Sequence, residues 1–418
     1  MKNKLLHTLI LNGLFGVFLF GCTPSGTQNQ KNMGVPSISQ PIMRDQELLA
    51  PTYNLEDFPD QVALLLPLSG DYKREGESIQ NGFLSAHYSL SDDKQGIKKI
   101  KIYDTQEFQD TVAAYDQALE DGADFVVGPL LQDSVNNLAK KIAFSVPVLT
   151  LNSLDDDESL IRMYQFSLSS VDEAISTSNK VIIDQNKIGL IIAPDNEWGH
   201  QLEEIYTTTL ESMGGVIIES QFYNQNEKDF SSELKELLEI SLSEKRYNRL
   251  SANLNEDLSF SPRRRQDVDF IFLVAADTTS GKLLKSQLNY HLSGDEALPI
   301  YSTSTIYSYN TNLDDLNGII FTDAPWVIDQ QIWLKNLPTT LRKYWPGDAI
   351  QSRQNAMGYD AYFLVAAINS LKNYSMQELN GATGQLYMEK DGRIRRRLAW
   401  AKLINGEPVV QKEHAVKQ

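Results

Sequence analysis

One residue with reactive chemistry stands near the N-terminus. Cys22 is the only cysteine among 418 residues, and it directly follows Leu19-Phe20-Gly21. A small residue before the cysteine, with an aliphatic residue three positions ahead of it, is typical of a thiol that is alkylated with diacylglycerol. Residues 1–21 read as a signal peptide, since two lysines precede a short apolar run. The sequence therefore predicts cleavage before Cys22 and a lipid on its thiol, rather than a membrane-spanning helix.

The residues after the cysteine indicate where that lipid would reside. Thr23, in place of an aspartate, resembles the sorting signal of lipoproteins that are exported to the outer membrane. At least two acyl chains are expected on such a cysteine, and two chains anchor a protein stably. Residues 22–58 are rich in Gln, Asn, Ser, Pro and Gly, which predicts a flexible tether. About 35 such residues reach roughly 30–35 Å. We expect an outer-membrane lipoprotein that faces the periplasm.

The rest of the sequence offers no set of catalytic residues. It has no H-E-x-x-H, no G-x-S-x-G, no P-loop and no G-x-G-x-x-G. With a single cysteine, the folded part can form neither a disulfide nor a thiolate metal site. We therefore expect no enzymatic activity, no cofactor and no metal. The net charge of −17 falls to near −19 once Lys2 and Lys4 are removed, which argues against nucleic acid as a partner.

Two arginine clusters stand out in this acidic chain. One is Arg263-Arg264-Arg265, and the other comprises Arg393, Arg395, Arg396 and Arg397. In a strand, Arg395 and Arg397 would point to one side and Arg396 to the other. The clusters could contact an acidic surface of a protein partner or the carboxylates of peptidoglycan. The alternative is that they are ordinary solvated charges.

Strands and helices alternate along the chain in two successive units. The strands are continuous apolar runs, which predicts parallel sheets covered by helices on both faces, an α/β fold. A helix follows over Met357–Leu371, and residues 383–409 read as antiparallel strands with a hairpin turn at Asp391-Gly392. A polar insertion at 241–266 has leucines at helical spacing, so part of it could be a helix. Strands are expected at 61–67, 98–104, 124–129 and 146–152 in the first unit, and at 187–194, 214–223, 268–275, 298–304 and 317–323 in the second.

A ligand cleft would lie beyond the carboxyl ends of these strands. Bulky leucines precede Gln132, and no arginine follows the strands to bind a carboxylate, so a small-molecule site there is poorly made. The candidate cleft residues are Ser69, Gly70, Leu131, Gln132, Asn152 and Ser153 in the first unit and Trp198, Asp277 and Thr278 in the second. Trp326 and Trp400 are expected to pack in the hinge and core rather than stack on a ligand.

The motifs resemble a known family. QVALLLPLSGDYKREGESIQNGF, at residues 61–83, is similar to the opening of a type I periplasmic-binding fold. Together with DGADFVVGPLLQDSV, VPVLTLNS, SPRRRQDVDFIFLVA, TDAPW and RIRRRLAWAKLINGEPV, it resembles the LppC family, the penicillin-binding protein activators called LpoA. The resemblance covers about residues 59–410. Long members carry a helical-repeat domain ahead of the binding fold, where this sequence has only the tether.

The resemblance implies a two-lobed fold with a C-terminal hairpin. The first lobe would take residues 59–165 and 325–378, the second 166–324 and 379–412, and 413–418 would form a tail. The chain would cross between lobes near Phe166, near Asp323-Ala324-Pro325 and near Asn380-Gly381.

The resemblance also implies a partner. It would be a class A penicillin-binding protein, a peptidoglycan synthase, which the domain would bind and activate without catalysis of its own. The alternative is a lipid-anchored receptor for a small ligand, such as an amino acid or a muropeptide.

Overall fold

The computed structural model describes the chain from residue 58 to residue 411 with short gaps. The predicted signal peptide, Cys22 and the tether up to residue 57 lie outside the described residues, as does the tail. The described ranges are 58–90, 99–141, 143–155, 159–254, 259–292, 297–309, 311–328, 336–346, 352–373 and 378–411.

The first lobe is built on an eight-stranded sheet with the order β11-β12-β13-β5-β4-β3-β1-β2. The strands β2, β1, β3, β4, β5 and β13 pair in parallel. Strand β12 pairs antiparallel with β13, and β11 pairs antiparallel with β12. Their bounds are β1 Gln61–Leu66, β2 Lys99–Asp104, β3 Phe125–Val127, β4 Val148–Thr150, β5 Met163–Phe166, β11 Leu379–Asn380, β12 Gln385–Met388 and β13 Arg393–Arg397.

The second lobe is built on a seven-stranded sheet with the order β15-β14-β10-β9-β8-β6-β7. Five parallel strands are followed by the antiparallel hairpin of β14 and β15. The bounds are β6 Ile188–Pro194, β7 Val216–Tyr223, β8 Phe270–Leu273, β9 Ile300–Ser302, β10 Ile320–Asp323, β14 Ala399–Ile404 and β15 Glu407–Val410. The two-lobed α/β fold with a C-terminal hairpin is confirmed, although both sheets are mixed rather than wholly parallel.

Helices cover both faces of each sheet because successive strand residues point to opposite sides. In β1, Leu64 packs with α1 and α11, whereas Leu65 packs with α2 and α3. In β6, Ile192 faces α6 and α8, and Ile191 faces α4 and α5. The helices are α1 Lys73–Leu90, α2 Thr111–Glu120, α3 Gln132–Ala139, α4 Ser170–Ile183, α5 Glu197–Ser212, α6 Ser231–Leu237, α7 Ile240–Leu254, α8 Thr278–His291, α9 Pro325–Ile328, α10 Asn336–Tyr344 and α11 Arg353–Asn373.

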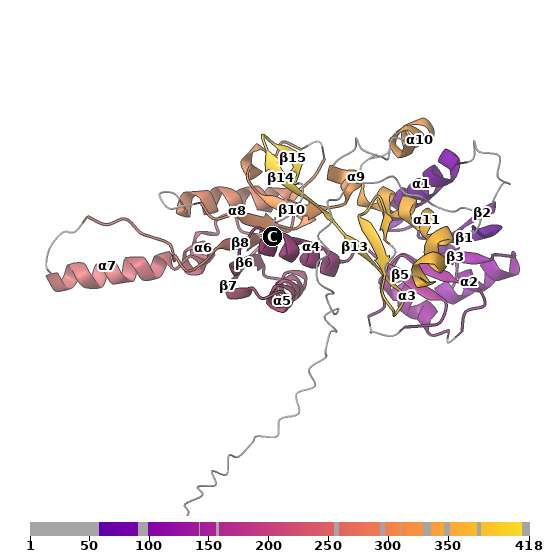
Figure 1. Cartoon of the computed structure of the whole chain (residues 1–418), viewed down its shortest axis with the longest axis horizontal. Coiled ribbons are helices and arrows are strands. Elements are labelled where there is room, and N and C mark those ends of the chain that lie inside the picture. The colour runs from indigo at the N-terminus through magenta and orange to yellow at the C-terminus, as the bar shows by residue number, and fades with distance from the viewer. Residues whose placement is uncertain are drawn as a thin grey trace, which may run out of the picture. The chain divides into compact units, whose positions relative to one another are not determined.

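Helices α1 and α11 approach each other closely through glycine (Figure 1). A Cβ atom added to Gly82 would lie 2.0 Å from the carbonyl oxygen of Asn355, and one added to Gly358 would lie 2.0 Å from that of Ile79. Only glycine permits this contact between backbones. The close packing joins the helix after the first strand to a helix nearly three hundred residues later, and so completes the first lobe.

The third crossing between the lobes lies at Leu398, so its predicted position near Asn380-Gly381 is wrong. Strands β11–β13 belong to the first sheet, and only β14 and β15 belong to the second. The physical reason is the buried carboxylate of Asp360 on α11. It accepts hydrogen bonds from the backbone amides of Ala382 and Thr383 and from the Thr383 hydroxyl, which holds this stretch on the first lobe.

Candidate functional site

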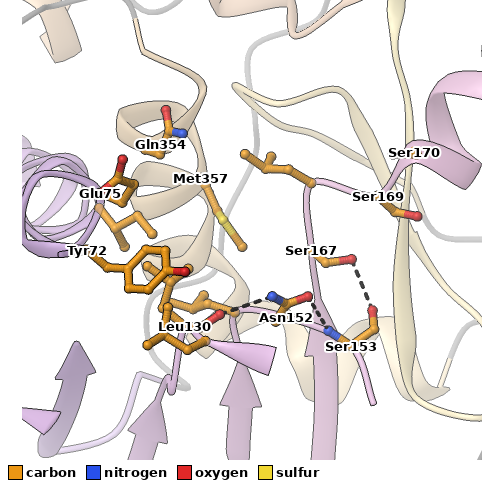
Figure 2. Close-up of a pocket in the computed structure, with 14 residues that line it drawn as sticks. Tyr72, Glu75, Leu130, Asn152, Ser153, Ser167, Ser169, Ser170, Gln354 and Met357 are labelled. Carbon is orange, nitrogen blue, oxygen red and sulfur yellow. Dashed lines mark hydrogen bonds between the residues drawn. The ribbon is translucent and has the colours of Figure 1, made fainter. Parts of the chain in front are cut away.

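A pocket of about 410 Å³ opens on the first lobe, where the chain leaves β5 for α4. Apolar and hydroxyl side chains line it, with one carboxylate and two amides among them (Figure 2). No lining residue comes from the body of the second lobe beyond the start of α4. The lining residues are Tyr72, Glu75, Ile79, Leu130, Leu131, Leu151, Asn152, Ser153, Ser167, Leu168, Ser169, Ser170, Gln354 and Met357.

The polar wall of the pocket is held by its own hydrogen bonds. The Asn152 side chain donates to the carbonyl of Leu130 at 3.2 Å and accepts from the amide of Ser153 at 2.9 Å. The hydroxyls of Ser153 and Ser167 lie 3.1 Å apart (Figure 2). Ser169 caps α4 by accepting from the amide of Val171. These bonds join the ends of β4 and β5, but they also use much of the polar capacity that a ligand would need.

The structure brings together only three of the nine predicted cleft residues, namely Leu131, Asn152 and Ser153. Ser69 and Gly70 are exposed beyond β1 and do not line the pocket. The Gln132 amide instead donates to Asp155 at 2.6 Å.

The three second-lobe residues also lie elsewhere. Trp198 packs against the core cluster beneath α5. The Asp277 carboxylate caps α8 by accepting from the amide of Ser280, and Thr278 is the first residue of that helix. The expected cleft between strand ends of both units is therefore not formed by these residues.

The lining residues that sequence reasoning missed lie at the starts of α1 and α11. Tyr72 and Glu75 come from the first turn of α1 and the loop before it, and Gln354 and Met357 come from the first turn of α11. The close packing of these helices at Gly82 and Gly358 aligns their ends. No signal in the separate segments shows that they share a pocket.

The cluster at Arg393–Arg397 is an internal ion-pair network rather than an exposed basic patch. Arg396 is 5% exposed, and its guanidinium lies 3.3 Å from the Asp172 carboxylate on α4. Arg395 lies 2.9 Å from Glu389 and 3.7 Å from Asp172. The outer members are also paired, Arg393 with Asp391 and Arg397 with Glu378.

The structure therefore excludes Arg396 as a surface contact for a partner. The pair of Arg396 with Asp172 instead links β13 of the first sheet to α4. Burial raises the pKa of Asp172 to about 6, and the two arginines oppose that rise without cancelling it.

A second buried pair connects the lobes at the second crossing. The guanidinium of Arg353, at the start of α11, contacts the Asp323 carboxylate at the end of β10 through bonds of 2.7 Å and 2.5 Å. It also donates to the carbonyl of Ser304 at 2.7 Å. Asp323 is 1% exposed, whereas the Arg353 side chain is 32% exposed, so this bidentate pair is shielded from solvent on the carboxylate side only.

The cluster at Arg263–Arg265 is split by the fold. Arg264 is 6% exposed and donates to the carbonyl of Arg265, so it is not a surface contact either. Arg265 forms a bidentate pair with Asp267 and lies 3.7 Å from Glu239. Arg263 is exposed.

Trp326 and Trp400 pack within the protein, as the sequence predicts. Trp326 is fully buried in α9 at the second crossing. The Trp400 indole donates to the carbonyl of Ser176 at 2.8 Å and so fixes the start of β14 to α4. Among the described residues there is no cluster of three or more potential metal ligands. No helix in the described ranges has the length and apolar character needed to cross a bilayer.

Comparison with known proteins decides the family. The family described as "LppC putative lipoprotein" matches residues 49–406, most of the chain. The chain belongs to the LppC family. The expectation of a family resemblance over most of the ordered chain is thereby confirmed.

Curated LppC-family relatives share about a quarter of their residues with this chain. The "Penicillin-binding protein activator LpoA" of Vibrio vulnificus is 24% identical over 349 residues, which is 82% of this chain and 57% of the relative. That of Aliivibrio fischeri is 26% identical over 355 residues, 84% of this chain and 57% of the relative. The chain thus spans about 57% of the length of these relatives.

Solved structures of the family share the fold. The LpoA C-domain from Haemophilus influenzae, described as a regulator of PBP1A, matches with a TM-score of 0.64 at 23% identity, over 84% of this chain and 99% of that domain. Full-length LpoA from the same organism matches with a TM-score of 0.65 at 24% identity, over 85% of this chain and 60% of that one. A branched-chain amino acid ABC transporter periplasmic ligand-binding protein from Burkholderia xenovorans matches with a TM-score of 0.57 at 14% identity, over 84% and 94%.

Proposed function

We propose that this protein binds a class A penicillin-binding protein and raises its rate of peptidoglycan synthesis, without catalysis of its own. The observation that carries the proposal is the match to the LpoA C-domain, of which 99% aligns with this chain. The solved domain is described as a regulator of PBP1A, and the curated relatives are named activators. The chain contains a counterpart of that whole domain.

The features of the site support a binding role rather than catalysis. The pocket presents side chains that are already hydrogen-bonded to one another, and the arginines of β13 neutralise internal carboxylates. The whole sequence contains no nucleophile–base motif. These features support the proposal that the protein changes its partner's rate by binding it.

The proposed location is the periplasmic face of the outer membrane, with the lipid on Cys22. The family description as a lipoprotein and the residues around Cys22 support this location. A synthase embedded in the inner membrane would then be reached across the periplasm. The predicted tether of about 35 residues adds roughly 30–35 Å of reach to the size of the domain.

The test is reconstitution of the full-length protein in detergent with a purified class A synthase from the same organism. We expect a complex in surface plasmon resonance and a several-fold rise in the rate of peptide crosslinking of lipid II. An unrelated outer-membrane lipoprotein serves as the control. The proposed function is wrong if no complex forms at protein concentrations on the order of 10 μM and the crosslinking rate is unchanged.

A further inference from the structure

Helix α7 projects from the second lobe instead of packing along it (Figure 1). Among the described helices and strands it makes extensive contact only with α6. Its buried residues are Ile240 and Ser243, both in the first turn. The chain returns through residues 259–265, and we call α7 and this return segment the arm. The three turns after residue 243 are therefore held away from the second lobe, without extensive packing against its described helices and strands.

The projecting part of α7 carries an apolar stripe. Tyr247, Leu250 and Leu254 follow at spacings of three and four residues, which places them on one face. Leu250 is 51% exposed and Leu254 is 52% exposed. The Tyr247 ring stacks on Phe260 of the return segment, with centroids 4.2 Å apart. Single exposed leucines are common, but a stripe along a projecting helix is typical of a docking surface.

The arm is basic, whereas the whole chain is strongly acidic. Residues 240–265 hold six lysines and arginines against three acids, in a protein of net charge −17. Lys245, Arg246, Arg249 and Arg263 are exposed, and within the described residues none of them has a carboxylate in ion-pair contact. Positive charge that is left unneutralised in this way fits a partner surface that is acidic.

The base of the arm is held by ion pairs and a backbone hydrogen bond, which favours its use as a preformed contact. Arg265 pairs with Asp267 and Glu239, and its amide donates to the carbonyl of Leu238 at 2.9 Å. Lys235 pairs with Glu244 across the junction of α6 and α7 at 3.4 Å. A helix fixed at its base loses little conformational freedom when a partner binds its tip.

We propose that the arm is the element that docks on the synthase. Tyr247, Leu250 and Leu254 would enter an apolar groove of the partner, and the exposed cations would face acidic groups on its rim. The proposal rests on the proposed function. A protein groove fits better than a lipid surface, because the apolar stripe of α7 consists of Tyr247, Leu250 and Leu254 and holds neither Trp nor Phe. Helices that lie on membranes bury broader faces rich in Trp, Phe and Leu.

The test compares matched variants of the full-length protein for synthase affinity. One variant is Lys245→Glu/Arg246→Glu/Arg249→Glu, and a second is Tyr247→Ser/Leu250→Ser/Leu254→Ser. The control is Lys99→Glu/Lys140→Glu/Lys187→Glu, which makes the same change of charge at exposed lysines outside the arm. We expect both arm variants to weaken synthase binding at least about tenfold, with the control unchanged. All variants should keep the melting temperature within about 2 °C, since the altered residues are largely exposed.

The outcomes separate this proposal from the proposed function. If wild type and both arm variants bind the synthase equally, the arm is not the docking element, although the proposed function stands. If the wild type does not bind the synthase, both proposals fall. Binding to liposomes of phosphatidylethanolamine and phosphatidylglycerol is measured as the last part of the test. These liposomes are tested with each protein in a Cys22→Ser background, which lacks the lipid. Retention that the arm changes abolish there, without any change in synthase affinity, would overturn the proposal in favour of a membrane contact.

Discussion

The buried pair of Arg396 with Asp172 offers a direct test of the contact between β13 and α4. The side chains are 4% and 2% exposed, so neither charge can be solvated when the other is removed. We predict that Arg396→Met destabilises the protein by about 3–5 kcal/mol at pH 7.5, the usual cost of breaking a buried pair. Methionine replaces the apolar stem of arginine with one of similar width, so most of the lost stability comes from the guanidinium rather than from packing of the stem. Asp172 is left with Arg395 at 3.7 Å as its remaining cation.

The cost of Arg396→Met should depend on pH in a defined direction. Burial raises the pKa of Asp172 from 3.8 to about 6, a shift of about 3 kcal/mol. The pKa of Asp172 is higher in the folded protein than in the unfolded chain, so protonation of this carboxyl favours the folded state. Its contribution to the free energy of unfolding is therefore fully present below about pH 4 and is lost as the pH rises to about 6. Loss of the arginine raises the pKa of Asp172 further. At pH 5.0 Asp172 is mostly protonated in the wild type and in Arg396→Met. The difference between their free energies of unfolding should therefore fall to about 1–2 kcal/mol.

Urea unfolding at pH 7.5 and pH 5.0, followed by circular dichroism, measures both quantities. The matched control is Arg393→Met, which removes a neighbouring arginine of the same strand whose pair with Asp391 is partly exposed at 3.5 Å. It should cost less than about 1 kcal/mol at either pH. An equal loss for Arg396→Met at both pH values, or a loss as small as that of the control, would refute the reasoning.

Two further changes test the helix contact and the anchor. Gly82→Ala should destabilise the protein by about 2 kcal/mol in thermal unfolding, because its Cβ would lie 2.0 Å from the carbonyl oxygen of Asn355. The control, Glu77→Ala on the exposed side of α1, should change the free energy of unfolding by less than about 0.5 kcal/mol. Equal losses of stability for the two variants would contradict the close contact. Cys22→Ser should abolish palmitate labelling and outer-membrane sedimentation while leaving the melting temperature unchanged, and continued labelling would show that the lipid is elsewhere.

The sequence predicts the two α/β units because their strands are apolar on both faces. The residues of β1, for example, alternate between α1 and α2, so every position after Gln61 is apolar. It does not predict β5 or α4. Strand β5 is only four residues long and includes the polar Gln165. Helix α4 buries Ser176, Thr177 and Ser178, which hides the usual periodicity of an amphipathic helix.

The site is harder to predict than the fold because it depends on contacts between distant segments. Arg396 reads as a surface charge in RIRRR, and only the structure shows Asp172 opposite it, 224 positions away. Trp198 and Asp277 follow strands, as ligand-binding residues often do, yet one packs in the core and the other caps a helix. The leucine spacing at 250 and 254 does predict helix α7, since it is a local pattern.

The position of the third crossing affects the order in which the two sheets can be completed as the chain folds. Strand β13 pairs with β5, and β14 pairs with β10, so one stretch of residues near the C-terminus supplies a strand to each sheet. Until that stretch pairs with them, β5 and β10 each present an open edge with unpaired amides and carbonyls. Neither sheet is complete before this stretch is in place, although most of the residues of each lobe precede it in the chain. A chain of this topology therefore exposes an unpaired strand edge in each lobe while it folds, and such edges are prone to aggregation.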